Sequence, residues 1–293
     1  MRRICGPRTS YAAPVYHRHM TATALDATLI GPLPHTTVST RLRSPRGVTE
    51  YTFEGVLLFD YLRAAGQMTS GPSANQYVVA TAEDGFVIAV AMAEVAPGFS
   101  DKQVMLATRQ NGESIRAGVR LVVPGDDLGG RSVYGLAGLE VRAVESKELS
   151  EAPASSAVEL LGGLERPGRA DADALRAVPQ TSMQTRPSKG HGDAVRPAEA
   201  YTGVLVWDVL DGAGIRLDDT LHEPFMRKIV VARDGDGYGV VIAGGELDPR
   251  FLNAPFLIAP TSATDPGLRL IAPYDIAGAR SVKGIASLEI RDA

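Results

Sequence analysis

An Arg-Ser-Val sequence occurs twice in this chain, at the start of two nearly identical segments. The first begins at Arg131 and reads RSVYGLAGLEVR, and the second begins at Arg280 and reads RSVKGIASLEIR. Eight of the twelve positions are identical. Each Arg-Ser pair places a cation and a hydroxyl group beside the exposed backbone N–H groups expected in a connecting loop, a combination suited to holding an anion. Arg131, Ser132, Arg280 and Ser281 are therefore the first candidates for a binding site.

Each pair lies within a longer strand–turn–strand pattern, at residues 118–142 and 267–291. In the first copy, Val119, Leu121 and Val123 alternate with other residues, as they do in a half-buried strand. A Pro-Gly-Asp-Asp turn then interrupts the alternation, which resumes in the last four residues. The Arg-Ser pair is thus expected in the loop between two strands.

The similarity continues over most of the chain and predicts two tandem copies of one fold. Each copy is expected to contain a strand leading into a cation-bearing loop, a short amphipathic helix closed by a glycine, a hairpin and a further strand. These elements are expected at 33–41, 55–66, 77–90 and 104–107, and again at 178–186, 203–214, 229–242 and 256–259. The predicted divisions are a disordered leader (1–23), a first copy (24–145), a linker (146–157) and a second copy (158–293). The opening strand of the first copy is either missing or replaced by the leader.

The composition argues against several classes of function. A chain of 293 residues with 44% hydrophobic and 22% charged residues is typical of a globular protein of about two domains. The net charge of −4 and the lack of a dense basic run argue against a nucleic-acid partner. No apolar stretch approaches the roughly 20 residues that a membrane span needs. The N-terminal segment lacks the apolar region of a secretory signal, so the residues as written indicate a cytoplasmic protein.

The order of elements and four motifs resemble the oxidoreductase molybdopterin-binding domain, the sulfite-oxidase-like fold, in its compact bacterial form. The motifs are Tyr201-Thr202-Gly203-Val204 with Trp207-Asp208, the hairpin GDGYGVVI, the segment RLVVPGD that begins at Arg120, and the loop GARSVK that begins at Gly278. The resemblance covers nearly the whole chain, twice, and implies an α+β fold with a mixed β-sheet. It also implies a molybdopterin cofactor, a redox protein partner and, as an alternative compartment, the periplasm.

In that family the arginine, serine and lysine of the loop help to hold the anionic phosphate of the pterin. The resemblance therefore assigns cofactor binding to five residues, which are Arg280, Ser281, Lys283, Arg131 and Ser132. In the first copy Tyr134 stands where the second has the lysine. The assignment fits the chemistry, because a guanidinium group forks onto phosphate oxygens and an ammonium group adds a point charge. The alternative is that arginine and serine hydrogen-bond only to their own loop.

The chain departs from the family where catalytic members bind molybdenum. Those members use a cysteine in the loop after the first long strand, here residues 40–47 and 185–192, and neither loop contains one. The soft thiolate ligand is therefore absent from both loops, and the lone Cys5 precedes the fold. The cations of these loops remain candidates for binding an anion, with a solvated basic loop as the alternative. They are Arg41, Arg43, Arg46, Arg186, Lys189 and His191.

Two hypotheses follow for the function. The first is a molybdopterin-binding oxidoreductase, and the second is a non-catalytic scaffold that keeps the fold and binds a small anion or a protein partner. No metal site is expected, because the histidines show no pairing at metal spacing apart from His17 and His19 in the leader. Asp234-Gly235-Asp236-Gly237 is interpreted as a hairpin turn rather than a calcium loop. Glu94 and Glu246, which recur at matching positions, are interpreted as solvated side chains.

Overall fold

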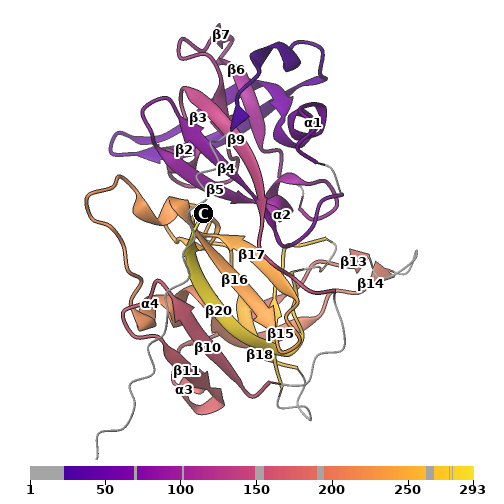
Figure 1. The fold of residues 1–293 in the computed structure, drawn as a ribbon, viewed down its shortest axis with the longest axis vertical. Coiled ribbons are helices and arrows are strands. Elements are labelled where there is room, and N and C mark those ends of the chain that lie inside the picture. The colour runs from indigo at the N-terminus through magenta and orange to yellow at the C-terminus, as the bar shows by residue number, and fades with distance from the viewer. Residues whose placement is uncertain are drawn as a thin grey trace, which may run out of the picture.

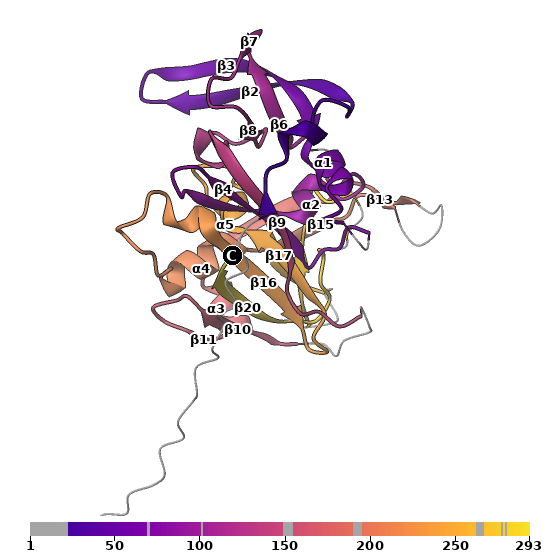
Figure 2. The ribbon, with the colours of Figure 1, turned by 45° about the horizontal axis from the view of Figure 1, so that its top comes forward.

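The structure is a computed structural model that describes residues 23–68, 71–100, 102–148, 155–189, 195–261, 267–276, 278 and 280–293. The predicted leader lies outside these residues except for Thr23. Strands predominate, and the helices are short. Two groups of strands lie one above the other, the first coloured indigo to magenta and the second mainly orange to yellow (Figures 1 and 2). We refer to residues 23–148 as the N-terminal half and to residues 155–293 as the C-terminal half.

The N-terminal half contains two antiparallel sheets. One has the strand order β1, β9, β4, β5, and the other has the order β2, β3, β6, β7, with β8 beside β6. The strands are β1 (Thr23–Ala24), β2 (His35–Ser44), β3 (Gly47–Leu57), β4 (Gln76–Ala82), β5 (Val87–Ala91), β6 (Met105–Gln110), β7 (Glu113–Ser114), β8 (Arg120–Val122) and β9 (Leu136–Ala143). The helices are α1 (Leu58–Ala64) and α2 (Met92–Val95), with single 3₁₀ turns at Ala27–Leu29 and Gly129–Arg131. The two residues of β1 occupy the edge position beside β9.

The C-terminal half contains a five-stranded sheet of order β11, β10, β20, β16, β17, a four-stranded sheet of order β12, β15, β18, β19, and the pair β13–β14. The strands are β10 (Ala157–Gly162), β11 (Gly168–Asp171), β12 (Gln180–Gln184), β13 (Ser188–Lys189), β14 (Val195–Arg196), β15 (Ala200–Leu205), β16 (Lys228–Asp234), β17 (Gly239–Ala243), β18 (Leu257–Pro260), β19 (Leu268–Ile271) and β20 (Ile285–Asp292). The helices are α3 (Ala172–Arg176), α4 (Val206–Ala213) and α5 (Gly244–Leu247), with a 3₁₀ turn at Pro224–Arg227. The five-stranded sheet is mixed, because β10 runs parallel to β20.

The local signals in the sequence explain these elements. Helix α1 is followed by Gly66 and α4 by Gly214, whose φ angles of 68° and 78° lie in the left-handed region that glycine adopts without a steric penalty. Both predicted hairpins are present, as β4–β5 and β16–β17. In the second hairpin, Oδ1 of Asp234 accepts hydrogen bonds from the backbone N–H groups of the three residues at 236–238. The Asp-Gly-Asp-Gly segment is therefore the hairpin turn that the sequence predicts.

Gly55 on β3 lies where no larger residue fits. A Cβ atom at this position would lie 2.0 Å from the carbonyl oxygen of Leu106 on β6. We expect Gly55→Ala to lower the free energy of unfolding by about 1–3 kcal/mol, because the two strands must separate to admit the methyl group. Urea denaturation measures this loss. Gly31→Ala is the matched control, since a Cβ there has no atom within 4 Å, and equal stability of the two variants would contradict the prediction.

The two halves pack sheet against sheet. Tyr77 and Val79 of β4 belong to one buried apolar cluster with Ile229 and Val231 of β16, together with residues of β5 and β17. The backbone N–H of Val241 on β17 donates to the carbonyl oxygen of Ala74, with N and O 2.8 Å apart. Apolar burial of this kind is the main driving force for such an association. The halves are thus held in a fixed relation, with their connecting loops facing each other.

Candidate functional site

The two Arg-Ser loops lie in the contact between the halves. The backbone N–H of Asp127 donates to the carbonyl oxygen of Phe251 (2.9 Å), and that of Ile276 donates to the carbonyl oxygen of Phe99 (2.8 Å). A Cβ atom on Gly130 would lie 2.6 Å from the ring of Phe251, so the glycine permits this close approach. The sequence predicted exposed backbone N–H groups in these loops, whereas the N–H groups of Asp127 and Ile276 bind the opposite half.

Arg131 has no solvent exposure and is surrounded by carboxylates of the protein. Its Nε and Nη2 atoms donate to Asp126 at 2.7 and 2.6 Å. Its Nη1 atom lies 2.9 Å from both carboxylate oxygens of Glu94. A buried guanidinium group needs such partners, because its desolvation is costly. Gly245 of the opposite half packs onto this side chain, since a Cβ there would lie 2.2 Å from Cδ of Arg131.

Arg280 repeats the arrangement in the C-terminal half. Its Nε and Nη2 atoms each donate to Asp275 at 2.7 Å. Its Nη1 and Nη2 atoms donate to Glu246 at 2.8 and 2.9 Å. Phe256 closes one side of the guanidinium group, with Cζ 4.9 Å from the ring centroid. The two arginines are therefore bound in the same way, each by one aspartate and one glutamate.

Glu94 and Glu246 are buried, with exposed fractions of 1% and 3%, so their interpretation as solvated side chains was wrong. Each lies in a one-turn helix, α2 or α5, that directly follows a buried strand. The strand carries the glutamate into the interior, and the arginine of the loop neutralises it there. The sequence held a signal for this contact, since glutamate and arginine both recur at matching positions in the two halves of the sequence.

The remaining residues of the Arg-Ser loops also contact their own surroundings. Oγ of Ser132 accepts a hydrogen bond from the backbone N–H of Val123 (3.3 Å). Oγ of Ser281 accepts one from the backbone N–H of Ala272 (3.1 Å). Lys283 is exposed. These contacts favour the alternative in which arginine and serine hydrogen-bond to the loop itself, and binding of a cofactor by the five residues stays a prediction.

The cations of the other two predicted loops divide into two groups. Arg41 is exposed, with Nε 3.9 Å from Glu50, and Arg43 is paired with Asp127 at 2.7 Å. Both arginines lie on β2, and Arg43 contacts the segment that leads into Arg131, through Asp127 and a backbone bridge to Leu128. Arg186, by contrast, lies at a pocket beside Arg280. The side chain of Lys189 and all of His191 lie outside the described residues.

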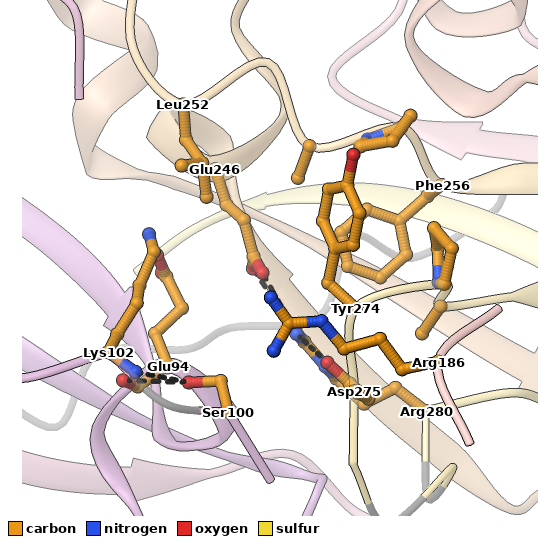
Figure 3. Close-up of a pocket in the computed structure, with 14 residues that line it drawn as sticks. Glu94, Ser100, Lys102, Arg186, Glu246, Leu252, Phe256, Tyr274, Asp275 and Arg280 are labelled. Atoms are coloured by element: carbon orange, nitrogen blue, oxygen red, sulfur yellow. Dashed lines mark hydrogen bonds and ion pairs between the residues drawn. The ribbon is translucent and has the colours of Figure 1, made fainter. Parts of the chain in front are cut away.

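This pocket has a volume of about 280 Å³ and takes its walls from both halves (Figure 3). The C-terminal half contributes a largely apolar wall, consisting of Leu252, Ala254, Pro255, Phe256, Ala272, Pro273 and Tyr274. The N-terminal half contributes Glu94, Ser100 and Lys102. Figure 3 shows the guanidinium group of Arg186 inside the pocket, pointing toward Glu246. Cζ of Arg186 lies 5.8 Å from the ring centroid of Tyr274.

The buried charges beside the pocket do not balance on their own. Four carboxylates are buried, those of Glu94, Asp126, Glu246 and Asp275. Arg131, Arg280 and Lys102 form ion pairs with them. Four negative charges against three positive ones leave a surplus of one negative charge. Arg186 is the remaining cation among the residues that line the pocket.

The pKa values of the two buried glutamates are shifted in opposite directions. Burial raises the pKa of Glu94, but the charges of Arg131 and Lys102 outweigh it and hold this pKa at about 2. Burial also raises the pKa of Glu246, and here the charges of Arg280 and, more weakly, Lys102 do not overcome it, while the negative charge of Glu94 adds to the effect. The difference follows from the sequence, because the position matching Lys102 is Ala254. Glu246 is therefore the carboxyl group that tolerates ionisation less well.

The residues around the pocket do not fit a molybdenum–pterin group. A phosphate monoester carries almost two negative charges at neutral pH, and it would enter a pocket whose buried groups already carry surplus negative charge. The donors of Arg280 that would receive it already bind Glu246 and Asp275. Within the described ranges, no three side chains of histidine, cysteine, aspartate or glutamate are arranged to hold a metal ion.

None of the helices in the described part of the chain has the length and apolar character of a membrane span.

Comparison with known proteins supports the family seen in the sequence for one part of the chain. Residues 35–150 match the oxidoreductase molybdopterin binding domain family. The sulfane dehydrogenase SoxCD from Paracoccus pantotrophus is a similar solved structure, with 17% sequence identity, coverage of 90% of this chain and 72% of that chain, and a TM-score of 0.33. No curated protein matches the sequence. The apolar wall of the pocket lies outside the matched range, in the C-terminal half.

Proposed function

We propose that this protein is a tandem form of the molybdopterin-binding fold that binds a small organic ligand between its halves and performs no molybdenum chemistry. One observation carries the proposal: each loop arginine that the family would use for its cofactor is buried against two carboxylates. Arg280 binds Glu246 and Asp275 through four hydrogen bonds. The pocket beside it is open and takes residues from both halves.

The equivalent contacts of the two halves support the tandem arrangement. Arg131 and Arg280 bind aspartates five residues before them and glutamates in matching one-turn helices. The hairpins that precede these helices also pair in the same way. On this proposal, duplication supplied the second half, and the cofactor loops became the contact between the copies.

The second candidate is a molybdopterin-dependent oxidoreductase that works with a redox protein partner. The family match at residues 35–150 favours it. The exposed Lys283 also favours it, because an ammonium group at the surface of the loop is available to an anion. In this case the cofactor would bind outside the pocket described above, and the carboxylates around Arg280 would not face it.

Elemental analysis of the full-length chain distinguishes the two candidates. We expect protein purified from a host that makes molybdopterin to contain far less than one molybdenum atom per chain, because the pocket disfavours a phosphate-bearing group. One molybdenum atom per chain would overturn the proposal. Lys283→Ala is the informative variant, since this exposed side chain can be removed without disturbing the core. If metal is found, its loss in Lys283→Ala would assign the cofactor to this loop.

A further inference from the structure

The wall of the pocket formed by Glu246 and Asp275 has the chemistry of a site for a positively charged group. Both carboxylates are nine-tenths or more buried, and Arg280 forms an ion pair with each of them. Low polarity around a charge strengthens its attraction for an opposite charge. The side chain that lies against this wall is Arg186, whose guanidinium group points toward Glu246 in Figure 3.

Aromatic rings complete the same environment. The ring of Phe256 faces the guanidinium group of Arg280 at 4.9 Å, and the ring of Tyr274 faces that of Arg186 at 5.8 Å. Tyr274 is 53% exposed, so part of its ring remains open to solvent at the mouth of the pocket. A cation over an aromatic face and beside a carboxylate is the arrangement by which proteins recognise ammonium and guanidinium groups.

An anionic ligand fits this pocket less well. Of the lining cations, Lys102 is paired with Glu94 at 2.7 Å and Arg280 is bound by two carboxylates. Only Arg186 is exposed to solvent among the three. An anion that drew Arg186 toward itself would leave the surplus negative charge of the buried groups without the remaining cation that lines the pocket.

We infer that the pocket recognises a small organic cation, such as an amidine or amine attached to an apolar body, and that Arg186 occupies the place of the ligand's cationic group. The inference rests on the proposed function, because it names the ligand class of the same pocket. The ligand's positive charge would lie against Glu246 and Asp275, and its apolar body against Phe256 and Tyr274. Arg186 would move out into solvent as the ligand enters.

Three probes of nearly equal size and different charge test the inference by isothermal titration calorimetry on the full-length chain. They are benzamidinium, which is a cation, benzamide, which is neutral, and benzoate, which is an anion. We expect benzamidinium to bind most tightly. Arg186→Gln is expected to tighten its binding about tenfold, because the competing side chain is removed and the open pocket becomes the populated state. Arg116→Gln, a change at an exposed arginine of the N-terminal half, should leave binding unchanged.

The direction of the Arg186→Gln effect separates the ligand classes. A cation site predicts tighter binding of benzamidinium, whereas an anion site predicts that benzoate binds and is lost in the same variant. Glu246→Gln should weaken benzamidinium binding about tenfold. If that variant folds poorly, Tyr274→Ala removes an exposed ring instead and should weaken binding about threefold.

Two results would overturn the cation inference. One is tighter binding of benzoate than of benzamidinium. The other is no benzamidinium binding by Arg186→Gln at millimolar concentration. If either result is obtained with molybdenum-free protein, the proposal that this fold performs no molybdenum chemistry still stands. Stoichiometric molybdenum in the purified chain would overturn the proposed function itself.

Discussion

Replacing Arg280 by methionine is expected to lower the free energy of unfolding by about 3–5 kcal/mol. The variant keeps an unbranched, apolar stem but removes the guanidinium group, so Glu246 and Asp275 stay buried without the cation that contacts both. A buried carboxylate without a partner is among the most destabilising features in a protein interior. Arg280 is 2% exposed, so water does not replace the lost contacts. Urea denaturation of the wild-type and variant chains at pH 7 measures the difference.

An exposed arginine with an ion pair provides the control for this experiment. Arg176 contacts Asp173 three residues away on α3, and both side chains are more than two-thirds exposed. Arg176→Met should change stability by less than about 1 kcal/mol. Equal stability of Arg280→Met and Arg176→Met would contradict a structural role for Arg280. That outcome would return the residue to the cofactor-binding role that the sequence suggested.

The order of elements was predictable because it depends on local signals. Two such signals are a glycine after a helix and alternating apolar residues on both sides of an Asp-Gly turn, and each acts over a few residues. The structure has helices directly before Gly66 and Gly214, where these glycines predicted a helix end. The similar segments in the two halves of the sequence show several of these signals a second time. The predicted hairpins and the C-terminal parts of the two predicted helices are present, but strands β3 and β15, which lead into those helices, were not predicted.

The role of the Arg-Ser loops was not predictable from local signals, because it depends on what packs against them. A loop with arginine, serine and glycine has the same sequence whether it faces a phosphate or the opposite half of the protein. The glutamates that bind these arginines lie far from the loops in the sequence, since Glu94 precedes Arg131 by 37 residues and Glu246 precedes Arg280 by 34. The role of Lys102 was not predictable either, because this residue binds Glu94 at a pocket that is lined mostly by residues of the other half.

Glu94→Gln and Glu246→Gln are expected to differ strongly in stability, although the two glutamates occupy matching positions. The pKa of Glu94 is held at about 2, so its ionised form is stabilised by Arg131 and Lys102, and its loss should cost about 3 kcal/mol at pH 7. The pKa of Glu246 is raised, so its ionised form is disfavoured in the folded protein. Glu246→Gln removes the surplus negative charge and should cost less than about 1 kcal/mol.

The pH dependence of stability tests the same asymmetry with the opposite sign for each group. A lowered pKa means that the stability contributed by Glu94 is present above its ordinary value of 4.5 and is lost as the pH falls toward about 2. Glu94→Gln should therefore lose less stability than the wild-type chain between pH 4.5 and pH 3. A raised pKa means that ionisation of Glu246 costs stability as the pH rises above 4.5, and Glu246→Gln should remove that cost. Urea denaturation on both sides of pH 4.5 measures the free energy of unfolding of each variant as a function of pH. If this dependence were parallel to that of the wild-type chain for both variants, the charge asymmetry would be contradicted.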